Sequence, residues 1–230
     1  TLFRSSPTTA GTMEWAKLGI LMSLLFFPNG PILIKLLFAV VLSIVGTFLF
    51  VQLINLIRVK DVIFVPLLGI MIGGILSSFT TFVALRTNAL QSIGNWLTGN
   101  FAVITSGRFE VLYLTIPLLI LAFVFANHFT IAGMGKDFSH NLGVSYEKII
   151  KIALFITATL TALVVVTVGT LPFLGLIVPN IISIYRGDHL KNALPHTLML
   201  GAIFVLIADI IGRIIVYPYE INIGLDRKSV

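Results

Sequence analysis

The sequence predicts an all-α, polytopic membrane helical bundle. Hydrophobic residues make up 57% of the chain and charged residues only 10%, whereas a soluble domain carries about 25% charge. Long uncharged runs separate the charged residues, and most of these runs reach the about 20 residues that a helix needs to cross ~30 Å of hydrocarbon. The runs lack the period-two alternation of membrane barrel strands, so helices are expected.

The uncharged runs place the individual spans. Glycines and prolines interrupt the long run 152–185, which therefore predicts two spans joined by a tight turn. The run 87–107 is rich in Asn, Ser and Thr and is predicted to be a polar, partly helical connection rather than a span. The other spans are each centred on one run. Seven helical spans are predicted, at residues 13–28, 31–57, 62–85, 109–129, 148–168, 172–186 and 191–216.

The distribution of Lys and Arg predicts the orientation. If the loop after residue 57 is cytoplasmic, alternation of the spans places the loop 130–147 inside and the polar stretch 87–107 outside. Seven basic residues then lie inside and four outside, which favours this orientation. The inner residues are Arg58, Lys60, Lys136, Lys148, Lys151, Arg186 and Lys191, and the outer ones are Lys35, Arg86, Arg108 and Arg213.

Several chemistries are disfavoured. The net charge of +6 is dispersed rather than gathered on one face, which argues against nucleic acid binding. The chain has no cysteine, its four histidines form no metal constellation, and no hydrolase motif is present. The Gly135-Lys136 pair fails the phosphate-loop pattern because Asp137 follows the lysine. We therefore expect no catalytic residues, no metal, no cofactor and no nucleotide site in this chain.

Two polar groups within the spans allow alternatives. Asp209 and Arg213 are four residues apart on one helix face, so they can form an intrahelical ion pair, or Arg213 can meet an acidic partner outside the membrane. Gly69, Gly73 and Ser77 form a small-residue ridge. This ridge can pack closely against another helix or form the wall of a polar pathway.

The C-terminal half carries a resemblance to a known family. The runs GTLPFLGLIVPNI at 169–181 and RGDH at 186–189 closely resemble the FecCD-type permeases, which belong to ABC importers of cobalamin and iron–siderophore complexes. SPTTAG at 6–11 and YEINIG at 219–224 resemble two further elements of that family. Within it, the likeness is greatest to permeases for catecholate siderophores such as petrobactin, so iron–siderophore import is the implied function.

The resemblance implies an assembly in the cell membrane. Such permeases have ten spans and pair with a second permease subunit, identical or different, around a central pathway. An extracytoplasmic binding protein delivers the siderophore complex, and two cytoplasmic ATPase subunits hydrolyse the ATP. This chain would therefore be a non-enzymatic transporter subunit that contacts membrane lipid and no nucleic acid.

The resemblance also implies roles for individual residues. The third span and the short outer helix that follows it would line the pathway, the turn before the third span would form the inner gate, and the loop 133–144 would receive the ATPase. Arg213 would pair with an acidic residue of the binding protein. The implied pathway residues are Gly69, Gly73, Ser77, Gln91, Asn95 and Trp96, the gate residues Lys60 and Asp61, and the coupling residues Gly133, Gly135, Lys136, Asp137, Leu142 and Gly143.

The chain departs from the family in two ways. Asn180 stands where many members have histidine, so a proton-linked role there does not transfer. About seven of the ten spans are present. Residues 1–5 and 226–230 can be encoded by near reverse-complementary DNA that matches a short-read sequencing adapter, so we expect 6–225 to be one permease domain truncated at both ends.

An ion-coupled secondary transporter is the alternative function. It would need an acid or a broken-helix ion site within the membrane, and Asp209 is the acid considered for that role. The neighbouring Arg213 would neutralise this acid, which favours the ATP-driven importer.

Overall fold

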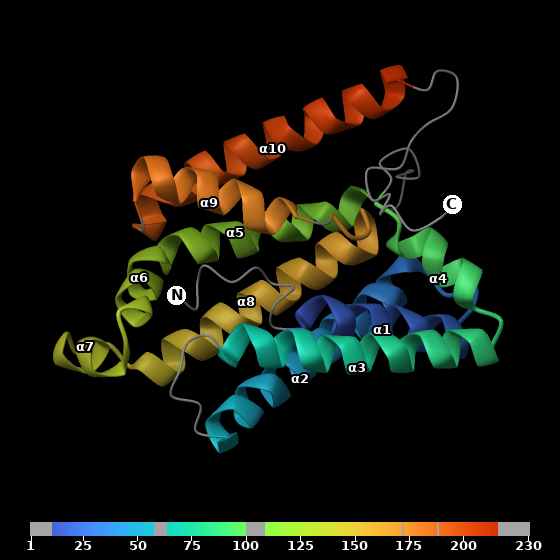
Figure 1. Cartoon of the computed structure of the whole chain (residues 1–230), viewed down its shortest axis with the longest axis horizontal. Helices are drawn as coiled ribbons and strands as arrows, with labels where there is room; N and C mark the ends of the chain where they lie inside the picture. The colour runs from blue at the N-terminus through green and yellow to red at the C-terminus, as the bar shows by residue number, and fades with distance from the viewer. Residues whose placement is uncertain (1–10, 58–63, 100–108, 172, 188, 216–230) are drawn as a thin grey trace.

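The computed structural model describes residues 11–57, 64–99, 109–171, 173–187 and 189–215, and this part of the chain is helical with no β-strand (Figure 1). The helices are α1 (Thr12–Phe26), α2 (Ile32–Ile57), α3 (Phe64–Arg86), α4 (Leu90–Leu97), the 3-10 helix η3 (Phe109–Leu114), α5 (Thr115–Val124), α6 (Ala126–Gly133), α7 (Lys136–Asn141), α8 (Tyr146–Thr167), α9 (Leu174–Arg186) and α10 (Leu190–Ile215).

Among the described residues, four helices are long and apolar enough to cross a membrane. They are α2, α3, α8 and α10, and the bent pair formed by Phe109–Val124 and Ala126–Gly133 would make a fifth span. Helices α1 and α9 coincide with two further predicted spans but have only 15 and 13 residues. The prediction of an all-α membrane bundle is confirmed, and the chain is a multi-pass membrane protein.

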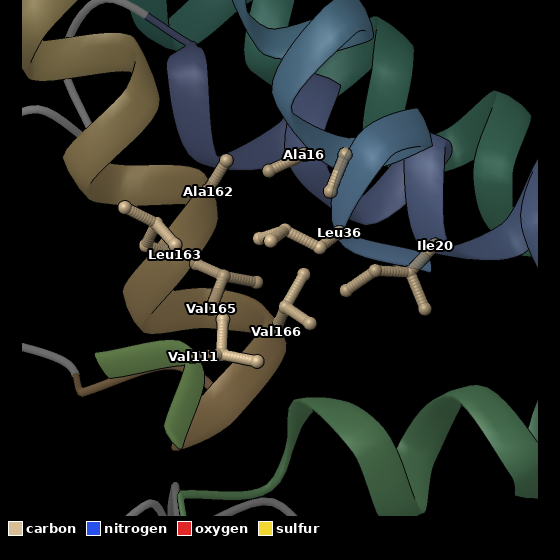
Figure 2. Close-up of a cluster of buried hydrophobic side chains, with 9 residues drawn as sticks. Ala16, Ile20, Leu36, Val111, Ala162, Leu163, Val165 and Val166 are labelled. Atoms are coloured by element: carbon tan, nitrogen blue, oxygen red, sulfur yellow. The ribbon is translucent and has the colours of Figure 1, made fainter. Parts of the chain in front are cut away.

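Helix α1 forms the centre of the bundle. Its residues Ala16 and Ile20 are fully buried, and they belong to one hydrophobic cluster with Leu36 of α2 and Val166 of α8 (Figure 2). Helices α2, α3 and α8 all contact α1 and surround it. A central helix can pack closely against its neighbours when small residues lie at the contacts, either on the central helix or on the neighbouring helices.

Small residues allow α1, α2 and α8 to approach closely. A Cβ on Gly19 of α1 would lie 2.6 Å from the Cα of Ala39 in α2, so only glycine fits at this crossing. Gly46 of α2 leaves room for the ring of Trp15 in the same way. On the same face of α2, the fully buried Ser43 donates a hydrogen bond to the carbonyl oxygen of Ala158 in α8 at 3.1 Å.

The outer helices expose large apolar side chains. Helices α2, α3 and α10 each present exposed Leu, Ile and Phe residues along most of their length, and no residue of the apolar window of α10 is buried. Soluble monomers seldom expose apolar patches of this extent. In a membrane, lipid chains or neighbouring helices cover such surfaces, which agrees with the composition of the chain.

The bundle has two distinct ends (Figure 1). Helices α6 and α7 lie at one end, on the left of the view, together with the turn between α9 and α10. The short helix α4 lies at the other end. The loop 130–147 and helix α4, predicted to lie on opposite sides of the membrane, are thus at opposite ends of the bundle. We call these the inner and the outer end after the predicted orientation, which stays a prediction.

Candidate functional site

The predicted outer helix is present as α4, and a defined turn joins it to α3. Asn88 takes a left-handed conformation (φ 53°) after α3, with Ala89 N–H bonded to Ala84 O at 2.9 Å and Asn88 N–H bonded to Leu85 O at 3.3 Å. This is the Schellman pattern that ends a helix. The turn directs the chain back over the outer end of the bundle.

Helix α4 is amphipathic at this end. Ile93 is buried in a cluster with Leu21 of α1 and Ala84 of α3, whereas Gln91 and Asn95 are exposed. The sequence-predicted polar residues therefore lie on the outward face of α4. Their predicted role at the pathway mouth stays a prediction.

Trp96 joins α4 to the start of α2. The Nζ atom of Lys35 lies 4.7 Å from the centre of the Trp96 ring, a distance at which a cation is attracted to the ring face. Trp96 also packs against the central cluster that contains Ile20 and Leu36. The sequence analysis identified Trp96 but not its partner, because 61 residues separate the two.

The end of α4 is bound to the connection between α8 and α9. The carbonyl oxygen of Leu97 accepts two hydrogen bonds from Thr170, from its backbone N–H and from its Oγ1, each at 2.9 Å. Gly169 has φ 92°, and a Cβ there would lie 2.9 Å from the carbonyl oxygens of Leu97 and Thr98. Glycine is therefore required both for the backbone angle and for the close approach.

Thr170 is expected to hold α4 in place. Thr170→Val removes the Oγ1 bond to Leu97 and keeps the backbone bond, so a hydrogen bond of about 1 kcal/mol is lost. Amide hydrogen exchange in the last turn of α4 should accelerate by about fivefold in the intact permease. Thr170→Ser keeps the hydroxyl and serves as the control. Equal protection in the Val variant and the unaltered protein would show that Oγ1 contributes nothing.

The glycine ridge of α3 faces α1. Gly69 and Gly73 are buried, and both lie within about 4 Å of a Cβ placed on Gly11, just before α1 begins. A Cβ on Gly73 would also lie 3.6 Å from Cγ of Glu14. The helix-packing interpretation of the ridge is confirmed for these two residues. Ser77 is half-buried, and a pathway role for the three residues stays a prediction.

Another face of α3 is open and carries small and polar residues. A Cβ on Gly74 would meet no atom within 4 Å, and Ser78 and Thr81 are exposed. The hydroxyl of Ser78 donates to Gly74 O at 2.9 Å and that of Thr81 to Ser77 O at 2.8 Å. These bonds within the helix lower the cost of placing hydroxyls beside apolar surface.

Glu14 is a polar residue that the sequence analysis missed. Its Oε1 pairs with Nζ of Lys17 at 2.7 Å, and both side chains are about four-fifths buried. Its Oε2 is buried and has no hydrogen-bond partner among the described residues. The residue was overlooked because it lies at the charged edge of a predicted span rather than within an uncharged run.

The inner loop contains a tight turn at Gly135, which is fixed by hydrogen bonds from Ser139. Gly135 separates α6 from α7 with φ 114° and ψ 167°, a conformation that is essentially restricted to glycine. The fully buried Ser139 directs its hydroxyl to Gly135 O at 2.8 Å and to Ile131 O at 3.2 Å. Ser139 therefore fastens α7 to α6, and the sequence analysis did not identify it.

A second Schellman motif ends α7. Gly143 has φ 71°, the N–H of Val144 bonds to Ser139 O at 2.9 Å, and the N–H of Gly143 bonds to His140 O at 3.0 Å. Val144 then packs against the cluster of Phe129, Ala132, Ile149, Ala153 and Ile156. Gly135 and Gly143 thus have defined backbone roles in the loop.

The loop presents apolar side chains at the inward end. Met134, Phe138 and Leu142 are 61%, 47% and 55% exposed. We call these three residues the loop surface. Gly133, the last residue of α6, is exposed as well. Large apolar side chains that are exposed together outside the spans favour a protein interface when they form one patch.

Some of the predicted site residues lie outside the described parts of the chain. Lys60 and Asp61, the implied gate, fall in the stretch 58–63 that the structure does not describe. The backbones of Lys136, Asp137 and Arg213 are helical, but their side chains are not described. Their roles, and the Asp209–Arg213 pair, stay predictions.

The fold matches a solved transporter. A structure described as the inward-facing conformation of a metal-chelate type ABC transporter aligns with a TM-score of 0.77, over 96% of this chain and 71% of that one. The sequences are 21% identical, so this likeness concerns the fold alone.

Curated relatives match along nearly the whole chain. The petrobactin import system permease protein YclN of Bacillus subtilis (strain 168) is 56% identical over 220 residues, which cover 96% of this chain and 70% of YclN. The petrobactin import system permease protein FatD of Bacillus anthracis is 38% identical, over 97% of this chain and 67% of that protein. The ferric-anguibactin transport system permease protein FatD of Vibrio anguillarum (strain ATCC 68554 / 775) is 35% identical, over 97% and 71%.

The sequence profile of the FecCD transport family matches residues 5–225, which include every described helix. This match and the similarity to the curated relatives confirm the family that the motifs at 169–181 and 186–189 indicated. The chain belongs to the FecCD transport family.

Proposed function

We propose that this chain is the transmembrane permease subunit of an ATP-driven ABC importer of iron–siderophore complexes. The observation that carries the proposal is the 56% identity to a petrobactin import permease over 96% of the chain. An iron–siderophore complex is large and charged, so it cannot cross hydrocarbon without a protein pathway and a source of energy. On this likeness we propose ferric petrobactin as the substrate and the cell membrane as the location.

The outer end of the bundle would receive the ligand, and the inner end would contact the ATPase. At the outer end, α4 and its polar residues Gln91 and Asn95 would receive the siderophore complex from an extracytoplasmic binding protein. At the inner end, the loop surface of Met134, Phe138 and Leu142 would seat on a cytoplasmic ATPase subunit, which hydrolyses the ATP. A second permease subunit would complete the pathway around α3.

The pathway wall would combine two faces of α3. Gly69 and Gly73 keep α3 close to α1, while the open face of Gly74, Ser78 and Thr81 offers small and polar surface to a passing ligand. The half-buried Ser77 lies between these faces. Lys60 and Asp61 would form the inner gate at the turn before α3.

Arg213 is proposed to dock the binding protein. Its backbone lies near the outward end of α10, where an arginine can pair with an acidic side chain of a partner. Arg213→Glu should replace this attraction by repulsion and weaken docking by at least about tenfold at low salt. Affinity is measured between the purified binding protein and the intact permease complex in nanodiscs. Lys151→Glu, near the start of α8 at the other end of the bundle, is the matched control and should leave the affinity unchanged. An unchanged affinity for Arg213→Glu would refute the assignment.

The proposed substrate is tested by uptake in cells. Disruption of the gene should abolish accumulation of radioactive iron supplied as ferric petrobactin, and the intact gene in trans should restore it. Ferric anguibactin, the substrate in the name of a less similar relative, serves as the comparison. Undiminished petrobactin-dependent uptake in the disrupted strain, with no redundant permease gene present, would overturn the substrate assignment.

A further inference from the structure

An open apolar groove lies between α5 and α10. Its volume is about 270 Å³, and nearly all of its lining is apolar. Leu119, Ile120 and Phe123 form the wall on α5, and Leu194, Pro195 and Leu198 form the wall on α10. The residues that line the groove all belong to these two helices.

A basic side chain stands at the inner end of the groove. Lys191 precedes Leu194, Pro195 and Leu198 by three, four and seven residues, a spacing that places all four on one face of α10. Arg186 ends α9, five residues before Lys191. Both side chains are exposed, and neither makes an ion pair with another described residue.

Helix α6 holds the start of α10 in place at the inner end of the groove. Helix α5 ends one residue after Phe123, and the chain bends by 57° into α6, which contacts α10. The start of α10 is fixed to α6, because the N–H of Leu190 bonds to Oγ1 of Thr130 at 3.3 Å. Lys191, the next residue, is therefore held close to α6 at the inner end of the groove.

The spacing along α10 matches the layers of a membrane leaflet. At ~1.5 Å per residue, Leu198 lies about 10 Å along the helix from Lys191. With Lys191 at the level of the headgroups, the groove lies among the acyl chains of the same leaflet. The Lys and Arg distribution predicts that this is the cytoplasmic leaflet, where anionic lipids attract basic residues.

We propose that the groove between α5 and α10 binds an anionic phospholipid of the cytoplasmic leaflet. One acyl chain lies between the two apolar walls, and the headgroup phosphate pairs with Lys191 and Arg186. A lipid accounts for both the apolar walls and the basic residue, whereas an apolar helix seated in the groove would leave Lys191 at its inner end without a role. The charge predicts a preference of about fivefold for an anionic over a zwitterionic headgroup per basic residue.

The proposal is tested by photocrosslinking in the intact permease with its partner subunits. p-Benzoylphenylalanine replaces Leu198, and the complex is placed in nanodiscs of equal phosphatidylglycerol and phosphatidylcholine. Mass spectrometry of the adducts should show at least about fivefold more phosphatidylglycerol. Lys191→Gln should reduce this preference, whereas Lys151→Gln on α8 should leave it unchanged.

The probe at Ile203, on another face of α10, is the matched control. It is exposed and should form lipid adducts with no headgroup preference. Adducts from the Leu198 probe to a peptide would show that protein covers the groove, and equal amounts of the two lipids would show no anionic site. Either result overturns the proposal. Because adducts are counted without any transport assay, the result does not depend on the proposed substrate.

Discussion

Gly19→Ala is expected to prevent the permease from accumulating in folded form. The new Cβ would lie 2.6 Å from Ala39 Cα, 2.7 Å from Phe38 O and 2.9 Å from Ala39 N. All three are backbone atoms, so no side-chain rotation can relieve the overlap, and α1 and α2 must separate. Separation would open the cluster around Ile20 and Leu36. The destabilisation should therefore reach or exceed the upper part of the ~1–3 kcal/mol range typical of overpacked cores.

The measurement is the yield of monodisperse permease complex after extraction into detergent, together with its resistance to protease. Gly74→Ala is the matched control, because a Cβ there meets no atom within 4 Å and alanine favours a helix by up to about 1 kcal/mol over glycine. A Gly19→Ala complex with the yield and protease resistance of the unaltered protein would contradict the close crossing of α1 and α2.

Gly135→Ala is expected to leave the permease folded and to uncouple ATP hydrolysis from uptake. At φ 114° and ψ 167° a side chain costs about 1–3 kcal/mol, so the chain should leave this conformation. The start of α7 would move, and Ser139 would lose its bond to Gly135 O. The loop surface would then no longer match the ATPase, and stimulation of ATP hydrolysis by the loaded binding protein should fall at least about fivefold.

Gly201→Ala is the control, because Gly201 lies in α10 without a positive φ angle and a Cβ there would meet only Val178 Cγ1, at 3.9 Å. Lys136→Glu should act in the same direction as Gly135→Ala by reversing a charge at the start of α7. Coupled ATP hydrolysis and uptake that are unchanged in both the Gly135→Ala and Lys136→Glu variants would remove the loop from the coupling mechanism.

A helix can be predicted from the sequence when one uncharged run of residues forms the whole of it. The predicted spans 148–168 and 191–216 correspond closely to α8 and α10, because apolar length alone defines such helices. The predicted span 109–129 is instead divided into η3, α5 and α6. No glycine or proline stands at the bend near Phe125; buried Ala126 and Phe129 and the stacking of Phe125 on Phe129 accompany it. Packing of this kind leaves no periodic signal.

The sequence identified several residues of the candidate site, but it did not identify the residues that they contact. The small-residue spacing of Gly69 and Gly73 predicted a close approach without naming Gly11 and α1 as the partner. The two bonds from Thr170 to Leu97 join residues 73 positions apart, and no local pattern records such a pairing. Ser139 resembles any loop serine until its hydroxyl is seen to join α6 and α7.

The central claim is that ATP, and not an ion gradient, drives import through this permease. The direct measurement uses sealed vesicles that contain the intact permease and its ATPase, with ATP trapped inside and loaded binding protein outside. Uptake of ferric petrobactin should require internal ATP and should persist when ionophores collapse the proton and sodium gradients. Uptake that follows an imposed ion gradient and ignores ATP would contradict the account and establish the ion-coupled alternative.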